Sequence, residues 1–487
     1  MTRASSRSSE WATFGRDLLV STGTTPRGQW TTHLSHQIRE AIRNGVLRPG
    51  VKLPSTRALA ADLRLSRGVV LAVYDQLKAE GYLSTTPGSG TTVADTGPGN
   101  AGSAPSTTPC PISPPASPGL PDPNLFPRHD WLKAYRRALQ HLPDADLHYG
   151  DPRGYEPLRA ELADYLGRVR GLRATHDQIL IVNGFAQGLA ILARVLAEHD
   201  ITTVAVEEPG STGTRRQLND WGIATPPADV DEHGLSTDSL EATGAPAVLL
   251  TPAHHYPTGV VLTPERRHQL LDWVHRKPGR YIIEDDYDAE YRYDHQPIGS
   301  LQPLSPERII TGSSVSKTLA PALRLGWLVV PYHLVDKATR TKATLDLGNS
   351  ILTQAALVEL LRTGTFDRHL RRSRRIYATK RRHVAHHLTT ELPHATISGL
   401  EAGLNICLRL EGLTNDQALA NQLSAQGVEC QALSYYQQRP TPQHGLVLDI
   451  AATTDRHLAL ITSTIHTFIK KASITQSSRQ AVPFRVV

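Results

Sequence analysis

The spacing of apolar residues predicts three short helices near the N-terminus. A first helix is predicted where apolar residues recur three or four positions apart, at Leu34, Ile38, Ala41 and Ile42. Ser55 is a good N-cap for a second helix that runs to about Leu63, and Ser66 for a third. The third helix has one apolar face, formed by Val70, Val73, Tyr74 and Leu77. These helices belong to one small helical unit.

A β-hairpin is predicted directly after the third helix. Gly81 ends the helix, and residues 82–86 and 91–93 flank a Pro87-Gly88-Ser89-Gly90 turn. Three short helices followed by a hairpin are the outline of a winged helix-turn-helix, in which the third helix enters the DNA major groove.

Further along the chain the pattern changes to short apolar runs separated by helical segments. Strands are predicted at residues 179–182, 204–206, 247–250, 281–283, 308–310 and 327–330. This alternation is typical of an α/β domain with a mostly parallel sheet. From about Asp367 a long basic helix leads into a smaller α+β part.

Composition places the boundaries between these parts. Residues 95–123 are rich in Gly, Ser, Thr and Pro and cannot bury a core, so we predict a linker there. The linker separates a DNA-binding domain at 27–94 from a larger domain at 124–472, and we predict a disordered tail at 473–487.

Overall composition narrows the class of protein. The three cysteines lie far apart, so neither a disulfide framework nor a zinc site is expected, and we assign no metal ligand. The N-terminus has no apolar core of a secretory signal, and no run is long enough to cross a membrane. We expect a soluble, cytoplasmic protein with no membrane partner.

Positive charge is concentrated near the N-terminus. The whole chain has a formal net charge of +6, whereas residues 27–95 alone contain nine Lys and Arg against five Asp and Glu. A local basic surface favours DNA as a partner, although a small helical domain with a solvated basic face has the same pattern.

The motifs of this unit resemble those of the GntR family of DNA-binding regulators. The resemblance rests on Gly45 to Ala60, Leu65-Ser66-Arg67, Glu80-Gly81-Tyr82-Leu83 and Gly88 to Val93. It implies that Ser55 and Arg57 contact phosphates and that Ser66, Arg67 and Gly68 begin the reading helix. It also implies that Gly90 shapes the wing tip, and we include Tyr74 in the DNA-binding set.

The larger domain contains the residue types that pyridoxal phosphate requires. The apolar strand ending at Glu284-Asp285-Asp286-Tyr287 delivers a carboxylate, and Lys317 lies among serines with Arg324 on the next turn. A lysine forms the Schiff base with this cofactor, and a carboxylate keeps its pyridine nitrogen protonated. Each piece also has a plain alternative: Asp285 as a helix cap or metal ligand, Tyr287 as a core residue, Lys317 as a solvated lysine.

In their order, these pieces resemble the class I aminotransferases of fold type I. The resemblance implies that Lys317 forms the Schiff base, Asp285 binds the pyridine nitrogen and Tyr287 binds the ring hydroxyl. It implies a phosphate site that is completed by the partner subunit's tyrosine. The phosphate-site residues that it implies are Gly184, Phe185, Ala186, Ser314, Ser316, Arg324 and Tyr149. Tyr256, which precedes Pro257-Thr258-Gly259, is a further implied cofactor-binding residue.

A GntR-like head, a Pro-rich linker and an aminotransferase-like body together resemble the MocR subfamily of regulators. Residues 284–294 and 316–326 carry this resemblance most closely. It implies a head-to-tail homodimer with exchanged domains, operator DNA and a small-molecule effector as partners, and pyridoxal 5'-phosphate as the cofactor.

The amino-acid side of the implied site departs from the aminotransferase pattern. Aminotransferases bind the substrate carboxylate with an arginine on a strand near the C-terminus, but the matching strand at 445–450 has none, and Asp449 would repel a carboxylate. Ser211 and Gly213 stand where amino-acid-sensing relatives have an aromatic residue and an arginine. We therefore expect the effector to be pyridoxal phosphate itself or an amine, with control of vitamin B6 or amino-compound genes. A working aminotransferase with a DNA-binding module, or one that retains only a half-reaction, is the alternative. A third option is a DNA-binding module with a cofactor-free relic body, which would be colourless.

The basic segment from Arg368 to Arg382 has two interpretations. It is either a solvated connecting helix with salt bridges to acidic neighbours, or a second DNA-contacting surface.

Overall fold

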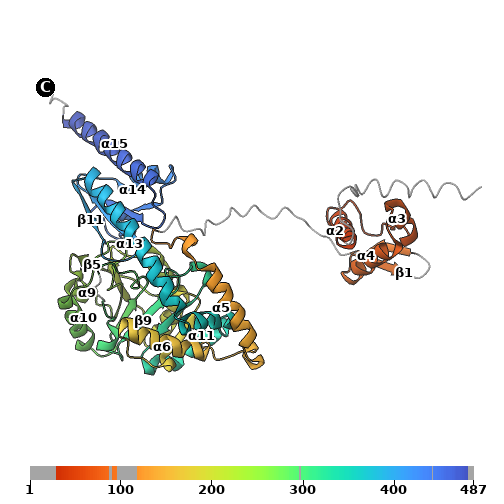
Figure 1. Cartoon of the computed structure of the whole chain (residues 1–487), viewed down its shortest axis with the longest axis horizontal. Coiled ribbons are helices and arrows are strands. Elements are labelled where there is room, and N and C mark those ends of the chain that lie inside the picture. The colour runs from red at the N-terminus through yellow and green to blue at the C-terminus, as the bar shows by residue number, and fades with distance from the viewer. Residues whose placement is uncertain (1–28, 87–89, 96–117, 295–297, 441–442, 481–487) are drawn as a thin grey trace, which may run out of the picture. The chain divides into compact units, whose positions relative to one another are not determined.

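The computed structural model describes residues 29–86, 90–95, 118–294, 298–440 and 443–480. The chain divides into two compact units, Met1–Ile112 and Ser113–Val487 (Figure 1), and each is described by itself. In the described residues no helix is long and apolar enough to cross a membrane.

The first unit is three helices and a hairpin around one core. Its elements are α2 (Trp30–Arg43), α3 (Thr56–Leu63), α4 (Arg67–Ala79), β1 (Leu83–Thr86) and β2 (Gly90–Val93). The predicted caps are present: the Ser55 side chain accepts from Ala58 N, and that of Ser66 accepts from Val69 N. The apolar face of α4 is buried against α2 and α3, as predicted, so the unit is a winged helix-turn-helix.

The second unit is built on an eight-stranded sheet of order β3-β10-β9-β8-β7-β4-β5-β6. Its strands are β3 (Ile179–Val182), β4 (Val204–Glu208), β5 (Pro227–Asp231), β6 (Gly234–Leu235), β7 (Ala247–Leu250), β8 (Tyr281–Asp285), β9 (Ile309–Ser314) and β10 (Gly326–Val329). The central strands β4, β7, β8 and β9 are parallel, whereas β10 is antiparallel to both of its neighbours. All six strands predicted for this sheet are present, and β5 and β6 at the edge are additional.

Helices cover both faces of the sheet because successive strand residues point to opposite sides. Leu180 and Val182 face α7 (Phe185–Ala197), α8 (Thr212–Asp220) and α11 (Val335–Asp346). Ile179 and Ile181 belong to a second core under other helices. The helices on this opposite face are α5 (Arg128–His141), α6 (Glu156–Arg170), α9 (Thr237–Ala242), α10 (Pro264–Arg276) and α12 (Ile351–Arg362). Both faces being buried explains why the strands are continuous apolar runs.

A smaller α+β part follows the long helix α13 (Thr365–Glu391), which runs from the large sheet toward it (Figure 1). Its antiparallel sheet has the order β11-β12-β14-β13, with strands β11 (Ala395–Ser398), β12 (Asn405–Leu410), β13 (Cys430–Ala432) and β14 (Gly445–Asp449). Helices α13, α14 (Asp416–Ser424) and α15 (Asp455–Gln480) cover one face. Helix α15 continues to Gln480, so residues 473–480 are helical where a disordered tail is predicted; residues 481–487 lie outside the described residues.

Short 3-10 helices complete the unit: η1 (Pro123–Leu125), η2 (Asp144–Leu147), η3 (His176–Gln178), η4 (Gln302–Leu304), η5 (Pro321–Leu323), η6 (Tyr332–Leu334) and η7 (Leu433–Tyr436). Of the predicted linker, residues 96–117 lie outside the described residues. Its last residues, from Pro118, are part of the second unit.

Candidate functional site

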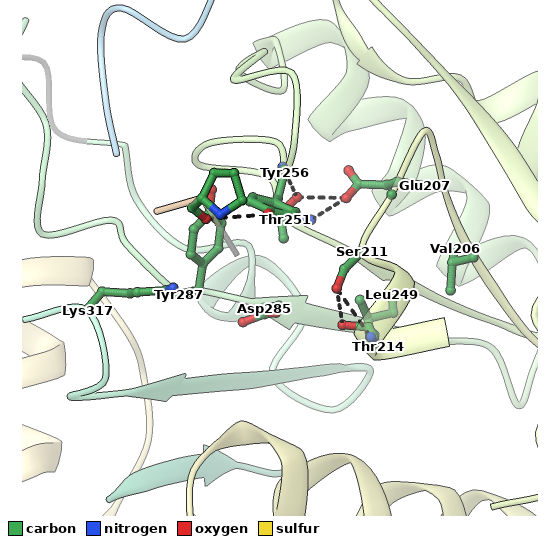
Figure 2. A pocket seen from close by; sticks show the side chains of 12 residues that line it. Val206, Glu207, Ser211, Thr214, Leu249, Thr251, Tyr256, Asp285, Tyr287 and Lys317 are labelled. Carbon is green, nitrogen blue, oxygen red and sulfur yellow. Dashed lines mark hydrogen bonds between the residues drawn. The ribbon is translucent and has the colours of Figure 1, made fainter. Parts of the chain in front are cut away.

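A cavity of about 190 Å³ lies at the carboxyl ends of the parallel strands, where ligands bind in open α/β sheets. Glu207 reaches it from β4, Thr251 from the residue after β7, and Asp285 from β8. Tyr287 and Lys317 line the same cavity (Figure 2). The structure thus brings together the lysine, the carboxylate and the tyrosine that the sequence singles out.

The three acids of residues 284–286 point in different directions because they are consecutive on a strand and its extension. Glu284 is buried and accepts from Ser300 Oγ and from Leu301 N. Asp286 forms a buried bidentate pair with Arg170, whose Nε lies 2.7 Å from Oδ2. Only Asp285 faces the cavity.

The charges of Asp285 and Lys317 depend on each other and on burial. Burial raises the pKa of Asp285 well above its usual value, and the charges of Asp286 and Asp288 raise it further. Burial lowers the pKa of the Lys317 amine, an effect that nearby carboxylates partly offset. Burial therefore disfavours the charged form of both groups, and a cation placed beside Asp285 would favour its carboxylate form.

Two tyrosines form one wall of the cavity. Tyr287 OH lies 2.9 Å from His254 Nδ1, which also contacts Asp288 Oδ2 at 2.9 Å. Tyr256 OH lies 2.9 Å from Tyr436 OH and donates to Pro118 O at 3.4 Å. The second contact connects the cavity with the end of the predicted linker.

The predicted phosphate residues meet at the N-terminus of α7. Gly184, at φ 76°, is its N-cap, and a Cβ there would lie 2.8 Å from Arg324 Nη2. Arg324 donates to Asn183 O, and Ser316 N donates to Ser314 Oγ at 3.3 Å. The ring of Phe185 packs on Gly312. At positions 185 and 186, therefore, an anion can be bound only by the backbone N–H groups at the start of the helix.

Tyr149 is not part of this cavity within one subunit. Its side chain is 89% exposed and lines a groove with Gly150, Asp346 and Asn349. The groove borders the phosphate loop, because Asn349 Nδ2 donates to Asn183 Oδ1 at 2.7 Å.

Strand β14 contributes no cation to the cavity. Val447 packs in an apolar cluster with Cys407, Leu433 and Tyr436. The carboxylate of Asp449 is held by backbone N–H groups, because Oδ2 accepts from Gly119 N at 2.8 Å and from Leu120 N at 2.9 Å. Arg439 pairs with Asp229. In the described residues that line the cavity, Lys317 is the only basic side chain.

Sequence reasoning misses Glu207 as a cavity residue. Its Oε2 accepts from Thr251 N at 3.0 Å and from Thr251 Oγ1 at 2.7 Å (Figure 2). Burial raises the pKa of Glu207 to about 8. A signal is present in the sequence, since Glu207 follows the apolar run at 204–206 much as the acids at 284–286 follow the run at 281–283.

These residues fit pyridoxal phosphate. The cavity combines a buried amine of lowered pKa with a carboxylate that lacks a cation, and the helix start beside Gly184 offers N–H groups with a guanidinium over them. In the described residues no group of three or more His, Cys, Asp or Glu could hold a metal ion.

The first unit presents its basic residues at the N-termini of two helices. Ser55, Arg57, Ser66, Arg67 and Gly68 are all exposed. Across the described residues, Arg57 and Arg67 form no ion pair with an acid. Gly90, at φ 92°, lies against Lys52, whose Cε would be 2.8 Å from a Cβ at that position.

Tyr74 is placed differently from the other predicted DNA-binding residues. Its side chain is buried, and its hydroxyl donates to Pro54 O at 2.9 Å. It lies on the apolar face of α4 and fixes this helix to the segment before α3, so its side chain does not face DNA.

Two family models match the chain. Residues 31–93 match the bacterial regulatory proteins of the gntR family, and residues 121–458 match aminotransferase class I and II. The chain is 34% identical over 452 residues to the probable rhizopine catabolism regulatory protein MocR of Rhizobium meliloti, covering 86% of this chain and 89% of that protein. It is 32% identical over 424 residues to the pyridoxine biosynthesis transcriptional regulator PdxR of Corynebacterium glutamicum, covering 85% and 90%.

The second unit also resembles solved aminotransferases. The α-aminoadipate aminotransferase LysN of Thermus thermophilus, complexed with N-(5'-phosphopyridoxyl)-L-leucine, has 25% identity and a TM-score of 0.65. The match covers 74% of this chain and 92% of that one.

Proposed function

The chain belongs to the MocR subfamily of GntR-type transcriptional regulators, and from that premise we propose that its aminotransferase-like body senses a ligand rather than turning over amino acids. The head binds DNA, and the fold-type I body takes pyridoxal phosphate as its cofactor. One observation carries the proposal: the cavity has the lysine and the carboxylate for the cofactor but, among its described lining residues, no arginine for a substrate carboxylate.

Each cavity residue has a defined task in this proposal. When bound, pyridoxal phosphate supplies an electrophilic carbonyl carbon and an electron-accepting ring. Lys317 supplies the primary amine, whose pKa is lowered by burial, and Asp285 holds a proton at the pyridine nitrogen. Tyr287, oriented by His254, donates to the ring hydroxyl. Ser314, Ser316, Arg324 and the N–H groups after Gly184 bind the phosphate.

The effector in this proposal is pyridoxal phosphate itself or an amine without a carboxylate. An amino acid brings a negative charge, and the described cavity wall around Glu207 and Asp285 offers no cation for it once Lys317 is engaged. A relative named for the regulation of pyridoxine biosynthesis supports the cofactor as effector.

The dimer is part of the proposal. Tyr149 is almost fully exposed in one subunit, so its ring is available to pack on a second subunit. The groove that contains it meets the phosphate loop through the contact between Asn349 and Asn183. A second copy seated in this groove would place its own tyrosine near the phosphate residues.

The visible absorbance spectrum of the purified protein tests the cofactor site. We expect a band for lysine-linked cofactor in the wild type with added pyridoxal phosphate, and none in Lys317→Ala. DNA binding is then measured with duplexes selected from a randomised pool, with and without the cofactor. A colourless wild type that binds the selected DNA regardless of cofactor would contradict the sensing role but not DNA binding.

A working aminotransferase is the second candidate, because Lys317 and Asp285 are both in place. It predicts that a common amino acid converts the bound cofactor stoichiometrically to its amine form, seen as loss of the visible band. We expect no conversion, and a conversion would overturn the proposed sensor.

A further inference from the structure

Five exposed arginines form a stripe along α13. Arg368, Arg371, Arg372, Arg375 and Arg382 are all exposed, and successive members are one, three or seven residues apart, which places them along one side of the helix. With a rise of about 1.5 Å per residue, the stripe is about 21 Å long. Between residues 368 and 390 the helix has no Asp or Glu.

None of the five arginines has an acidic partner among the described residues. Arg368 donates to Thr363 O and to Thr365 Oγ1, near the start of the helix. Arg375 and Arg382 donate to backbone oxygens four residues earlier in the same helix. These contacts leave the positive charge of the stripe uncompensated.

The acids nearest to the stripe are already engaged. A hollow of about 790 Å³ opens beside it, lined by Arg371, Arg374, Arg375 and Glu290 among others. Asp367, at its rim, accepts from Arg168 at 3.0 Å. Burial raises the pKa of Glu290 to about 7, so this carboxyl compensates little of the charge below neutral pH.

The remaining basic residues of the helix are used in packing. Arg374 donates to Glu290 O, and Arg381 is buried and donates to Gly399 O and Gly403 O. Lys380 donates to Ala451 O and lies 3.9 Å from Asp122. The helix therefore has an inner set of cations that is used in packing and an outer set with no acidic partner among the described residues.

We propose that the arginine stripe of α13 is a second DNA-binding surface, which contacts phosphates of the duplex outside the segment read by the winged helix. Unpaired guanidinium groups bind phosphate in a bidentate manner. At about 3.4 Å per base pair, a stripe of about 21 Å extends along about six base pairs. The proposal goes beyond DNA binding by the winged helix. It rests on the proposed function in one respect: DNA is taken as the polyanion because the N-terminal unit binds DNA.

The test compares full-length variants by fluorescence anisotropy on a random-sequence duplex of about 40 base pairs, at salt from about 50 to about 200 mM. We expect Arg371→Gln/Arg375→Gln to reduce the slope of log K against log salt by at least about 1.8, since each lost phosphate contact removes about 0.9. The control is Arg276→Gln/Lys277→Gln at the end of α10, which removes the same charge from side chains that are 60% and 61% exposed but are ion-paired with Glu241. An unchanged slope, or an equal loss in the control, would overturn the proposal.

A head variant separates the proposal from the proposed function. Arg57→Gln/Arg67→Gln is expected to weaken binding but to leave a salt-dependent remainder, which the stripe substitutions then remove. Binding unaffected by the head variant would instead contradict the assignment of the head. Equal thermal midpoints and cofactor absorbance of all variants verify that the folds are intact.

Discussion

At the residue scale, three neighbouring acids have different roles because their side chains point to different sides of a strand and its extension. Glu284, Asp285 and Asp286 are adjacent, yet one is bonded to Ser300, one faces the cavity and one pairs with Arg170. A substitution of Asp286 would leave the buried Arg170 without its carboxylate partner, whereas one of Asp285 removes a group that faces the cavity.

Glu207 makes stability depend on pH. The pKa of this carboxyl is about 8 in the folded protein against 4.5 ordinarily, so between these values the folded chain keeps a proton that the unfolded chain has lost. Raising the pH through this window destabilises the fold by up to about 1.4 kcal/mol per pH unit. We expect Glu207→Gln, whose amide oxygen still accepts from Thr251, to lose this slope in urea denaturation without added cofactor.

The matched control is Glu232→Gln, since the Glu232 side chain is 83% exposed. This variant should keep the wild-type slope. The explanation fails if Glu207→Gln also keeps it.

Sequence reasoning at this scale is strongest where polar residues lie at or just after the end of an apolar strand. It leads to Asp285, Tyr287 and Lys317, which the structure brings into one cavity, while their roles in cofactor binding stay predictions. Tyr74 is assigned to DNA from its place in a motif, although its apolar spacing points to the core where it lies. Glu207 is missed because the Pro-Gly turn after its strand is the more conspicuous feature of the sequence there.

At the element scale, local rules explain the head almost completely. Caps, apolar spacing and the turn residues predict α2, α3, α4 and the hairpin, because each is set by contacts within a few residues. Strands β5 and β6 are not predicted, since Pro227–Asp231 is mostly only half-buried at the sheet edge and lacks an apolar run.

The N-cap of α4 stabilises the helix, and we predict that it also contacts DNA. Ser66→Ala removes the acceptor for Val69 N and should destabilise the head by about 1 kcal/mol. Ser66→Asp retains a capping oxygen and should keep the stability, but its negative charge at the helix start should weaken DNA binding at least about tenfold, about 1.4 kcal/mol. Thermal denaturation and anisotropy with duplex DNA measure the two effects.

A Ser66→Asp variant that binds DNA as tightly as the wild type would contradict the placement of the α4 N-terminus against the duplex. Ser84→Asp is a control for added charge, because Ser84 is exposed on β1 of the hairpin. Its effect on binding should be smaller.

At the scale of the whole molecule, Tyr149 predicts that each site is shared between two subunits. In the proposed dimer, a Tyr149→Ala subunit retains its own Lys317 and receives an intact tyrosine from a Lys317→Ala partner. Neither variant alone has a complete site, but a mixed dimer has one. We therefore expect co-expressed variants to recover about half of the tight cofactor binding per dimer that two complete sites would give.

Absorbance after co-purification through two different tags measures this recovery. The same variants mixed without exchange of subunits serve as the baseline. Recovery in neither preparation, with both variants folded, would contradict the shared site.

Long-range features are the least predictable from sequence. Three such features join segments that are hundreds of residues apart or lie on different elements. They are the groove around Tyr149, the hollow beside α13 and the contact of Asp449 with Gly119. Family resemblance, rather than any local pattern, points to the exposed tyrosine.

The hydrogen bonds at Pro118, Gly119 and Leu120 fix the end of the linker beside the cavity. The backbone that leads away from the body toward the DNA-binding unit leaves from the cavity wall itself, tied to Tyr256 and to Asp449. If these three residues were released, the tether would lengthen by about 10 Å, at about 3.3 to 3.6 Å per extended residue. If the proposed dimer forms, a ligand that loosened these contacts would give its two DNA-binding units a longer reach along DNA.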